Sequence, residues 1–447
     1  MKRLLRTALV GTLALGLAAP AFADHEIGGY FRTQFIMASQ GVSAGWGAPV
    51  VPGAGLVTKD EKPDKMVDNR LRIRWQNNIN EYVSIVWFGE IDTPWGQPSK
   101  GAIGSGGRQG MDGVNVETKH AYADVKIPDT PVSFRVGGQG WGGAFNGVVM
   151  NDDMMGVRAN VKLDMVSTTL FWAKLLENDR FREDDKDLYS VQVGLTPIKG
   201  LKITPELTWI RDQPGDRDDF FAGIELAHKI ANIDVSGWFL YNWGTDESGP
   251  ADVDTQAFAA SAKVATQIAG VKASLRLMYF SNDDDAKDDK SINPGGRDGG
   301  AAFSNGGFEF FDEYLQIFLT DIYYNNWIGG RRALLDAAYS GFGLFGAVAG
   351  GTYVPPAVKA LTLRGAVGYF MALDDERNDS AAAADNREGT SLGTEISVSV
   401  GYKIAGNAEL NLRGAYALLG DFYDGQAAGG RDPDDLYITV LMLNIPY

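Results

Sequence analysis

Three arginines alternate with apolar residues in one short segment of the chain. Arg70, Arg72 and Arg74 are separated by Leu71 and Ile73. Residues two apart in a β-strand point to the same face, so the three guanidinium groups would form a row roughly 13 Å long at about 3.3 Å per residue. Guanidinium groups hold carboxylates and phosphates through paired hydrogen bonds. The spacing therefore favours the holding of anions along a wall over covalent catalysis.

The apolar partners of these arginines indicate where such a wall would stand. A charged side chain that faces lipid at the middle of a membrane costs about 2–4 kcal/mol, so the charged face is expected to line the lumen of a barrel. The same alternation predicts a larger set of basic lumen residues: Arg32, Arg70, Arg72, Arg74, Arg135, Arg158, Lys162, Arg276, Arg364 and Arg413. Fewer acidic residues fall on this face: Glu90, Glu206, Glu225, Glu395 and Glu409.

Acidic residues are concentrated elsewhere, although the chain as a whole has a formal net charge of −16. Many of them lie in segments expected to be long loops, such as 283–289 and 432–435. A basic wall in a confined passage raises the local concentration of anions. The alternative interpretation is that the wall charges pair across neighbouring strands and only keep the passage wet.

The residue types needed for catalysis are scarce. The three histidines, His25, His120 and His228, are far apart, and none belongs to a nucleophile–base pattern. The sequence contains no phosphate-binding loop and no clustered metal motif. It also has no cysteine, which excludes disulfides, thiolate metal sites and thiol catalysis. We therefore predict neither an enzyme nor a bound cofactor or metal.

The elements that must position the charged residues are strands, because two-residue periodicity recurs along nearly the whole chain. Eighteen strands are predicted, at 25–38, 68–79, 82–91, 114–127, 132–140, 154–164, 166–176, 187–196, 201–211, 219–230, 232–243, 254–268, 271–282, 341–355, 359–373, 392–404, 408–419 and 434–447. Sixteen is the alternative, because 308–355 is hard to divide.

Short and long connections alternate between these strands. The sequence thus predicts an all-β fold, a single transmembrane antiparallel barrel with short periplasmic turns and long extracellular loops.

Residues 1–23 have the features of a secretory signal peptide. A positive region at 2–6 precedes a short apolar core at 9–19 and a small-residue cleavage site at 21–23. Cleavage there would leave 24–447 as the barrel and remove three cations, which takes the net charge from −16 to −19. We expect the mature chain in the outer membrane of a Gram-negative cell.

The last strand ends on an aromatic residue. Tyr437, Leu441, Leu443 and Tyr447 share one face, and such a terminal strand resembles the assembly signal of outer-membrane barrels. Pro446 cannot donate a ladder hydrogen bond, so the sequence predicts that this strand end frays.

The segment 283–340 is the longest predicted loop, and loops of this length are usually functional or disordered. Its aromatic stretch at 308–327 favours a lumen plug, with a short helix around 315–322. The alternatives are an additional pair of strands or a contact between barrels on the outside.

Two patches resemble porins of the alginate-export type. They are the strand–loop–strand segment from 134–141 to 155–159 and the segment from 392 to 422. The first departs from that family at Gly138, where the family commonly has arginine. The resemblance implies a monomeric barrel of about eighteen strands with a basic lumen.

These observations predict an outer-membrane channel for passive diffusion of small hydrophilic, preferentially anionic solutes. The alternatives are an exporter of an anionic polysaccharide and the barrel sheath of a cytochrome electron conduit. The expected partners are outer-membrane lipid and lipopolysaccharide, the barrel-assembly machinery and small anionic solutes. A periplasmic partner protein is a further possibility that the sequence does not identify, and no nucleic acid is expected.

Overall fold

The computed structural model describes the greater part of the barrel. The described residues are 24–39, 64–96, 116–179, 182, 184–247, 249, 252–282, 288–289, 315–319, 341–377, 385–425 and 430–447. The predicted signal peptide and most of 283–340 lie outside them. Among the described residues, no helix is long and apolar enough to cross a membrane.

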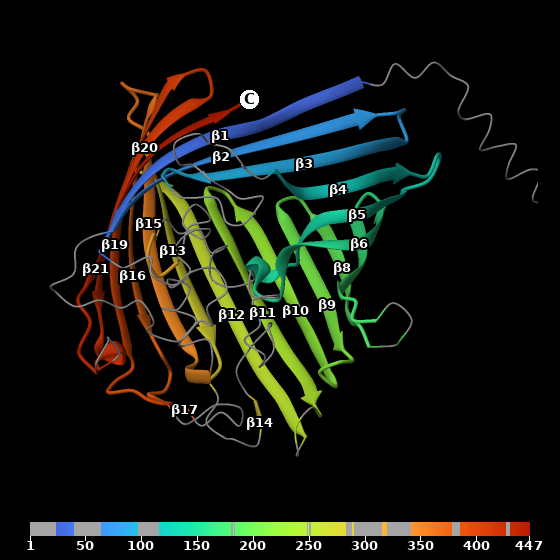
Figure 1. Ribbon diagram of the computed structural model, residues 1–447. Coiled ribbons are helices and arrows are strands. Elements are labelled where there is room, and N and C mark those ends of the chain that lie inside the picture. The colour runs from blue at the N-terminus through green and yellow to red at the C-terminus, as the bar shows by residue number, and fades with distance from the viewer. Residues whose placement is uncertain are drawn as a thin grey trace, which may run out of the picture.

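Eighteen antiparallel strands form the wall, and β21 pairs with β1 to close it (Figure 1). They are β1 (Asp24–Ala38), β2 (Asp64–Asn78), β3 (Val83–Pro94), β4 (Glu117–Lys126), β5 (Val132–Gly142), β6 (Asn151–Lys162), β7 (Val166–Leu176), β8 (Lys186–Ile198), β9 (Leu201–Asp212), β10 (Arg217–Ile230), β11 (Ile233–Asp246), β12 (Val253–Ile268), β13 (Val271–Phe280), β15 (Leu344–Tyr353), β16 (Leu361–Met371), β19 (Ser391–Ala405), β20 (Ala408–Leu419) and β21 (Leu436–Pro446).

The predicted count of eighteen is confirmed. The segment that was hard to divide contributes one wall strand, β15, which pairs with β13 and β16. Among the described loop residues there are three strands of two residues each, namely β14 (Asp288–Asp289), β17 (Glu376–Arg377) and β18 (Asp385–Asn386). The described residues also form the short 3-10 turns η1 (Phe145–Gly147) and η5 (Asp421–Tyr423).

Connection lengths alternate as predicted, so the barrel has a short-turn end and a long-loop end. At the short-turn end, residues 199–200 join β8 to β9 and residues 231–232 join β10 to β11. Ala231 and Gly200 have positive φ values of 53° and 84°, as the tight turns of hairpins require. Asp24 and Tyr447 lie at this same end, because β1 begins and β21 ends there.

The outer face of the wall is apolar. Leu170, Val191 and Leu207 are 48%, 42% and 45% exposed on neighbouring strands, while the residues that alternate with them are more buried. Toward the long-loop end, aromatic rings stack from strand to strand: the Trp209 ring lies 5.0 Å from that of Tyr189 and 5.7 Å from that of Phe220. An exposed apolar band edged by aromatic rings is the outer surface that a membrane barrel needs.

The inner face, where the alternation predicts the charged residues, has two tiers. The tier near the long loops is buried and contains apolar side chains such as Leu188, Leu240 and Phe280, together with charged ones such as the Lys186–Asp212 ion pair. The tier near the short turns carries polar side chains such as Lys162 and Lys202, which are exposed. The tier near the long loops is buried partly because segments of the chain fold inward onto it.

The seam between the two ends of the chain is fully hydrogen-bonded, so the prediction of a frayed terminal strand is wrong. The Tyr447 N–H donates to the Gly29 carbonyl at 3.0 Å, and the Gly29 N–H donates to the Tyr447 carbonyl at 3.1 Å. The Tyr447 hydroxyl also donates to the Arg72 carbonyl at 3.0 Å. The missing N–H of Pro446 costs no ladder hydrogen bond, because the pairing of β21 with β20 already ends at Asn444.

Tyr447→Asp is expected to reduce the amount of folded barrel in the outer membrane. It replaces a ring at the seam with a charge and removes the hydroxyl bond to β2. Tyr447→Phe is the control, since it keeps the ring and loses one hydrogen bond worth about 1 kcal/mol. Heat-modifiable mobility on gels measures the folded fraction. Equal folded fractions in Tyr447→Asp and the parent would contradict the assembly role.

Candidate functional site

The arginine row on β2 lies against carboxylates of β3. The Arg70 Nε and Nη2 atoms donate to the two carboxylate oxygens of Asp92 at 2.7 and 2.6 Å. Arg70 also lies 3.4 Å from a carboxylate oxygen of Glu90, which pairs with Arg72. Arg70 is only 2% exposed. The strand register causes this pairing, because it sets Arg70 opposite Asp92 and Arg72 opposite Glu90.

The rest of the row is also engaged in contacts along the wall. Arg74 donates to the side chain of Gln76 on the same face of β2. Arg32 on β1 is buried and lies opposite Arg70 in the register. At β1–β3 the charges are therefore arranged largely as the wall-pairing interpretation expects, since Glu90 and Asp92 on β3 pair with two of the three arginines of the row.

Two further predicted arginines stand on β5 and β6. Arg135 forms a bidentate pair with Asp124, with nitrogen–oxygen distances of 2.7 and 2.9 Å, and its guanidinium carbon lies 3.9 Å from the centre of the Tyr122 ring. Arg158 faces Arg135 across the strands and is half-buried. Lys162 lies further along β6 and is exposed near the short turns.

The remaining basic residues of the predicted set lie on β13, β16 and β20. Arg276 on β13 donates to the Ser261 hydroxyl at 2.9 Å and to the Asn146 side-chain oxygen at 3.4 Å. Arg364 on β16 and Arg413 on β20 both face Ser399 on the strand between them. Both arginines are half-buried on the inner face.

Glu206 has a role that the sequence did not suggest, because it anchors an inward segment. Its carboxylate accepts from the backbone N–H of Ala144 at 2.6 Å and from the Gln192 side chain at 2.9 Å. Ala144 belongs to the 143–150 connection, which was predicted as part of an ordinary long loop. The carboxylate is therefore covered by this segment and 4% exposed.

The inward segment 143–150 packs across the inside of the wall. Its turn η1 contacts β10 and β11 (Figure 1). Phe145 is fully buried, and a Cβ at Gly223 of β10 would lie 2.8 Å from its ring. The Trp238 indole N–H donates to the Asn146 side-chain oxygen at 2.7 Å. The apolar content of this connection was the sequence signal that would have indicated an inward fold.

Glu395 anchors a second inward piece, residues 315–319. Its carboxylate receives the backbone N–H groups of three consecutive residues of that piece. All five residues are buried, and the Phe318 ring lies 5.1 Å from that of Phe370. This part consists of bends, so the helix expected around 315–322 is not formed in its described residues. The rest of 283–340, apart from β14, lies outside the described residues.

The other predicted acids are less enclosed. Glu225 is half-buried on the inner face of β10. Glu409 on β20 accepts from the Asn411 side chain at 2.9 Å and faces Lys403 near a short turn. At the long-loop end, partial burial and then the carboxylates of Asp432, Glu388 and Asp421 raise the pKa of Asp424.

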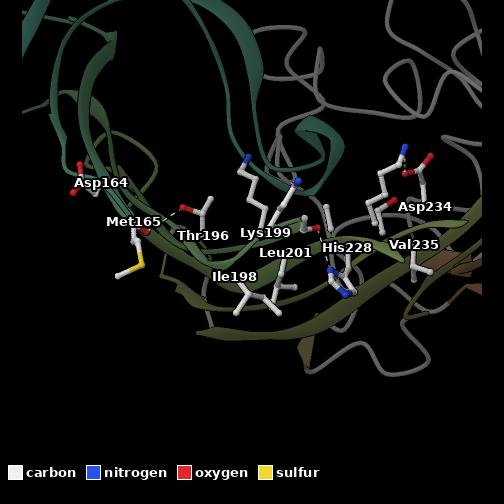
Figure 2. Close-up of a pocket in the computed structure, with 14 residues that line it drawn as sticks. Asp164, Met165, Thr196, Ile198, Lys199, Leu201, His228, Asp234 and Val235 are labelled. Carbon is white, nitrogen blue, oxygen red and sulfur yellow. Dashed lines mark hydrogen bonds and ion pairs between the residues drawn. The ribbon is translucent and has the colours of Figure 1, made fainter. Parts of the chain in front are cut away.

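The histidines make local contacts. His120 lies 2.7 Å from an Asp153 carboxylate oxygen, and the His228 Nδ1 lies 3.0 Å from the Gly200 carbonyl. Within the described ranges no three acidic or histidine side chains are placed to hold a metal ion. A hollow of about 580 Å³ lies at the short turns of β8–β9 and β10–β11. Figure 2 shows Lys199 and Asp234 on one side of the sheet there and Ile198 on the other.

The fold has clear counterparts among solved structures. OpdQ of Pseudomonas aeruginosa matches with a TM-score of 0.57 and 9% identity, over 95% of this chain and 98% of that one. OccK8 (OprE) of the same organism matches with 0.57 and 11%, over 95% and 98%. OccAB1 of Acinetobacter baumannii matches with 0.56 and 12%, over 96% and 98%. The likeness establishes a shared fold. No protein-family model matches the sequence, and no curated protein matches it.

Asp92→Ala is expected to destabilise the folded barrel by about 3 kcal/mol. Removing one partner of a buried ion pair leaves the other charge uncompensated and typically costs 3–5 kcal/mol. The lower end applies because Glu90 remains near Arg70. Urea unfolding of the refolded protein in lipid vesicles measures the change, with exposed Asp164→Ala as the control. An unchanged unfolding midpoint would contradict the strength assigned to this pair.

Proposed function

We propose that this protein is an outer-membrane channel for passive diffusion of small hydrophilic solutes. The observation that carries the proposal is the closed barrel with an apolar outer face and charged residues on the inner one. Only a closed ladder satisfies the backbone of a membrane β-sheet, and polar side chains on the inner face are typical of a water-filled passage. The structures that it resembles are outer-membrane porins of the Occ and Opd types.

The proposed orientation follows from the two ends. Short turns and both chain termini are typical of the periplasmic end of such barrels, and long loops of the extracellular end. The acidic loops would then face outside, and the exposed Lys162 and Lys202 would stand near the periplasmic mouth. The secretory signal predicted at 1–23 supports export to this membrane.

Anion preference is part of the proposal, and the wall from β12 to β20 supports it. The inner face of these strands carries six basic residues: Lys263, Lys272, Arg276, Arg364, Lys403 and Arg413. Two acidic residues share it, Glu395 and Glu409, which leaves a formal excess of four positive charges. At β1–β3, by contrast, the arginine row lies against Glu90 and Asp92. We therefore assign more of the selectivity to β12–β20 than to the Arg70 row.

The alternative functions stay predictions. The patches that resemble alginate-export porins lie on β5–β6 and on β19–β20 with the η5 turn that follows. Export of an anionic polysaccharide would use the same basic wall. A cytochrome sheath would need a haem protein partner, because the sequence has no cysteine to attach haem.

Replacing Arg364 and Arg413 with serine is expected to move the zero-current potential toward cation preference. The change removes two positive charges from the proposed path. The shift should grow at low salt, because the Debye length reaches about 30 Å at 0.01 M. Planar-bilayer recording across a salt gradient measures it. Arg211→Ser, at an exposed site on the outer face of β9, is the control and is expected to leave the zero-current potential unchanged.

Two results would contradict the proposal at different levels. Absence of any conductance from the folded parent protein would count against a channel. An unchanged zero-current potential in the folded double variant would count against anion selection by β12–β20 and leave the channel itself in place. The triple replacement of Arg70, Arg72 and Arg74 by serine tests the competing location on β2.

A further inference from the structure

Glu395 of β19 is held by three consecutive backbone N–H groups. The Gln316 N–H donates to one carboxylate oxygen at 2.5 Å, and the Phe318 N–H donates to the other at 2.7 Å. The Ile317 N–H lies 3.1 Å from both oxygens. Successive backbone N–H groups that converge in this way form an anion-binding concavity, termed a nest.

The carboxylate is completely enclosed. Glu395 is 0% exposed, and besides the three backbone N–H groups its carboxylate accepts a hydrogen bond from the Ser397 hydroxyl at 2.6 Å. Burial of a carboxylate is unfavourable unless hydrogen bonds replace its hydration, and bonds to a charged acceptor are stronger than neutral ones. The nest therefore supplies most of the hydrogen bonds that replace the hydration of the buried Glu395 carboxylate.

Glu206 provides an informative contrast. Its carboxylate also meets an inward segment, but only through the Ala144 N–H. Its other donors belong to the wall itself, namely Ser190, Gln192 and Thr208. Glu206 would keep its wall partners if the segment moved away. Glu395 would keep only Ser397 among its present donors, so carboxylate and segment depend on each other.

Apolar contacts also hold residues 315–319 against the wall, but they define the position of this piece less precisely than the hydrogen bonds to Glu395 do. The Phe318 ring packs on Phe370 of β16, and a Cβ at Gly368 would lie 2.4 Å from the Leu315 Cδ1 atom. Gly368 faces Glu395 in the strand register, so both kinds of contact meet at one place. Apolar packing is non-directional, whereas hydrogen bonds to one carboxylate define position and orientation.

We propose that residues 316–318 form a carboxylate-binding site whose internal occupant is Glu395, and that Glu395 acts as a latch that holds 315–319 inside the barrel. Glu395 is thus a positioning residue. In the proposed channel the latch would keep this part of the inner face covered, and in that respect it rests on the proposed function. The class of ligand that the site takes is a small monocarboxylate.

Thiol labelling tests the latch without relying on conductance. The chain has no cysteine, so Gln316→Cys introduces a single thiol on a nest residue and leaves the backbone N–H in place. Gln316 is 7% exposed, so its cysteine is expected to react slowly with a charged thiol reagent. Adding Glu395→Ala should raise the labelling rate by about ten- to a hundredfold, in line with the loss of charge-assisted hydrogen bonds.

Chemical rescue separates a binding site from a general loosening. Formate at high concentration should slow labelling of the Glu395→Ala variant again, because it can occupy the vacated nest. Glu409→Ala is the matched control, since it removes another inner-face glutamate that bonds only to Asn411 among the described side chains. In that background the labelling rate should stay low, with or without formate.

Three results would overturn the latch. They are an unchanged labelling rate in Glu395→Ala, a failure of formate to slow it, and an equal effect of formate in the control. Glu395→Gln should give an intermediate rate and serves if the alanine variant does not fold, which heat-modifiable mobility shows. Conductance of the parent protein is recorded separately, so failure of the channel proposal is distinguished from failure of the latch.

Discussion

Lipid offers no hydrogen-bond partners to a backbone that crosses it, so each N–H and C=O of a spanning strand must be satisfied by another strand. In this chain the requirement is met by pairing β21 with β1, which brings Tyr447 beside Gly29. The eighteen-strand wall exists only because this last pair forms. Closure also gives the two faces of the wall different surroundings. The outer face meets lipid and is apolar, whereas the inner face is separated from lipid and carries charged residues.

Closure also determines what the buried charges must do. A carboxylate on the inner face has lost part of its hydration and needs donors close by. Asp92 and Asp124 obtain them from arginines on neighbouring strands. Glu206 and Glu395 obtain them in part or mainly from backbone N–H groups of inward segments. The first arrangement balances the wall charge, and the second determines where a segment of the chain lies inside the barrel.

The two tiers of the inner face follow from the same arrangement. The inward residues 143–150 and 315–319 bring apolar side chains such as Phe145 and Phe318, which need apolar partners on the wall. The buried tier near the long loops supplies them. Exposed charges are left toward the short turns, where Lys162 and Lys202 stand. In the proposed channel, solutes would therefore meet a polar region at one end and a packed region at the other.

Much of this was determined by the sequence alone. Alternation of residues such as Arg72 with Leu71 and Ile73 encodes strands, and the alternating lengths of the connections encode an antiparallel barrel, because both are local properties of the chain. Local patterns also assigned Arg70, Glu206 and Glu395 to the charged face. They did not reveal the contacts of these residues. Whether Arg70 faces Asp92, whether Tyr447 finds Gly29, and whether a loop turns inward onto Glu206 depend on register and on contacts between distant segments. Only the tertiary structure decides these, because a hydrogen bond depends on the position of both partners.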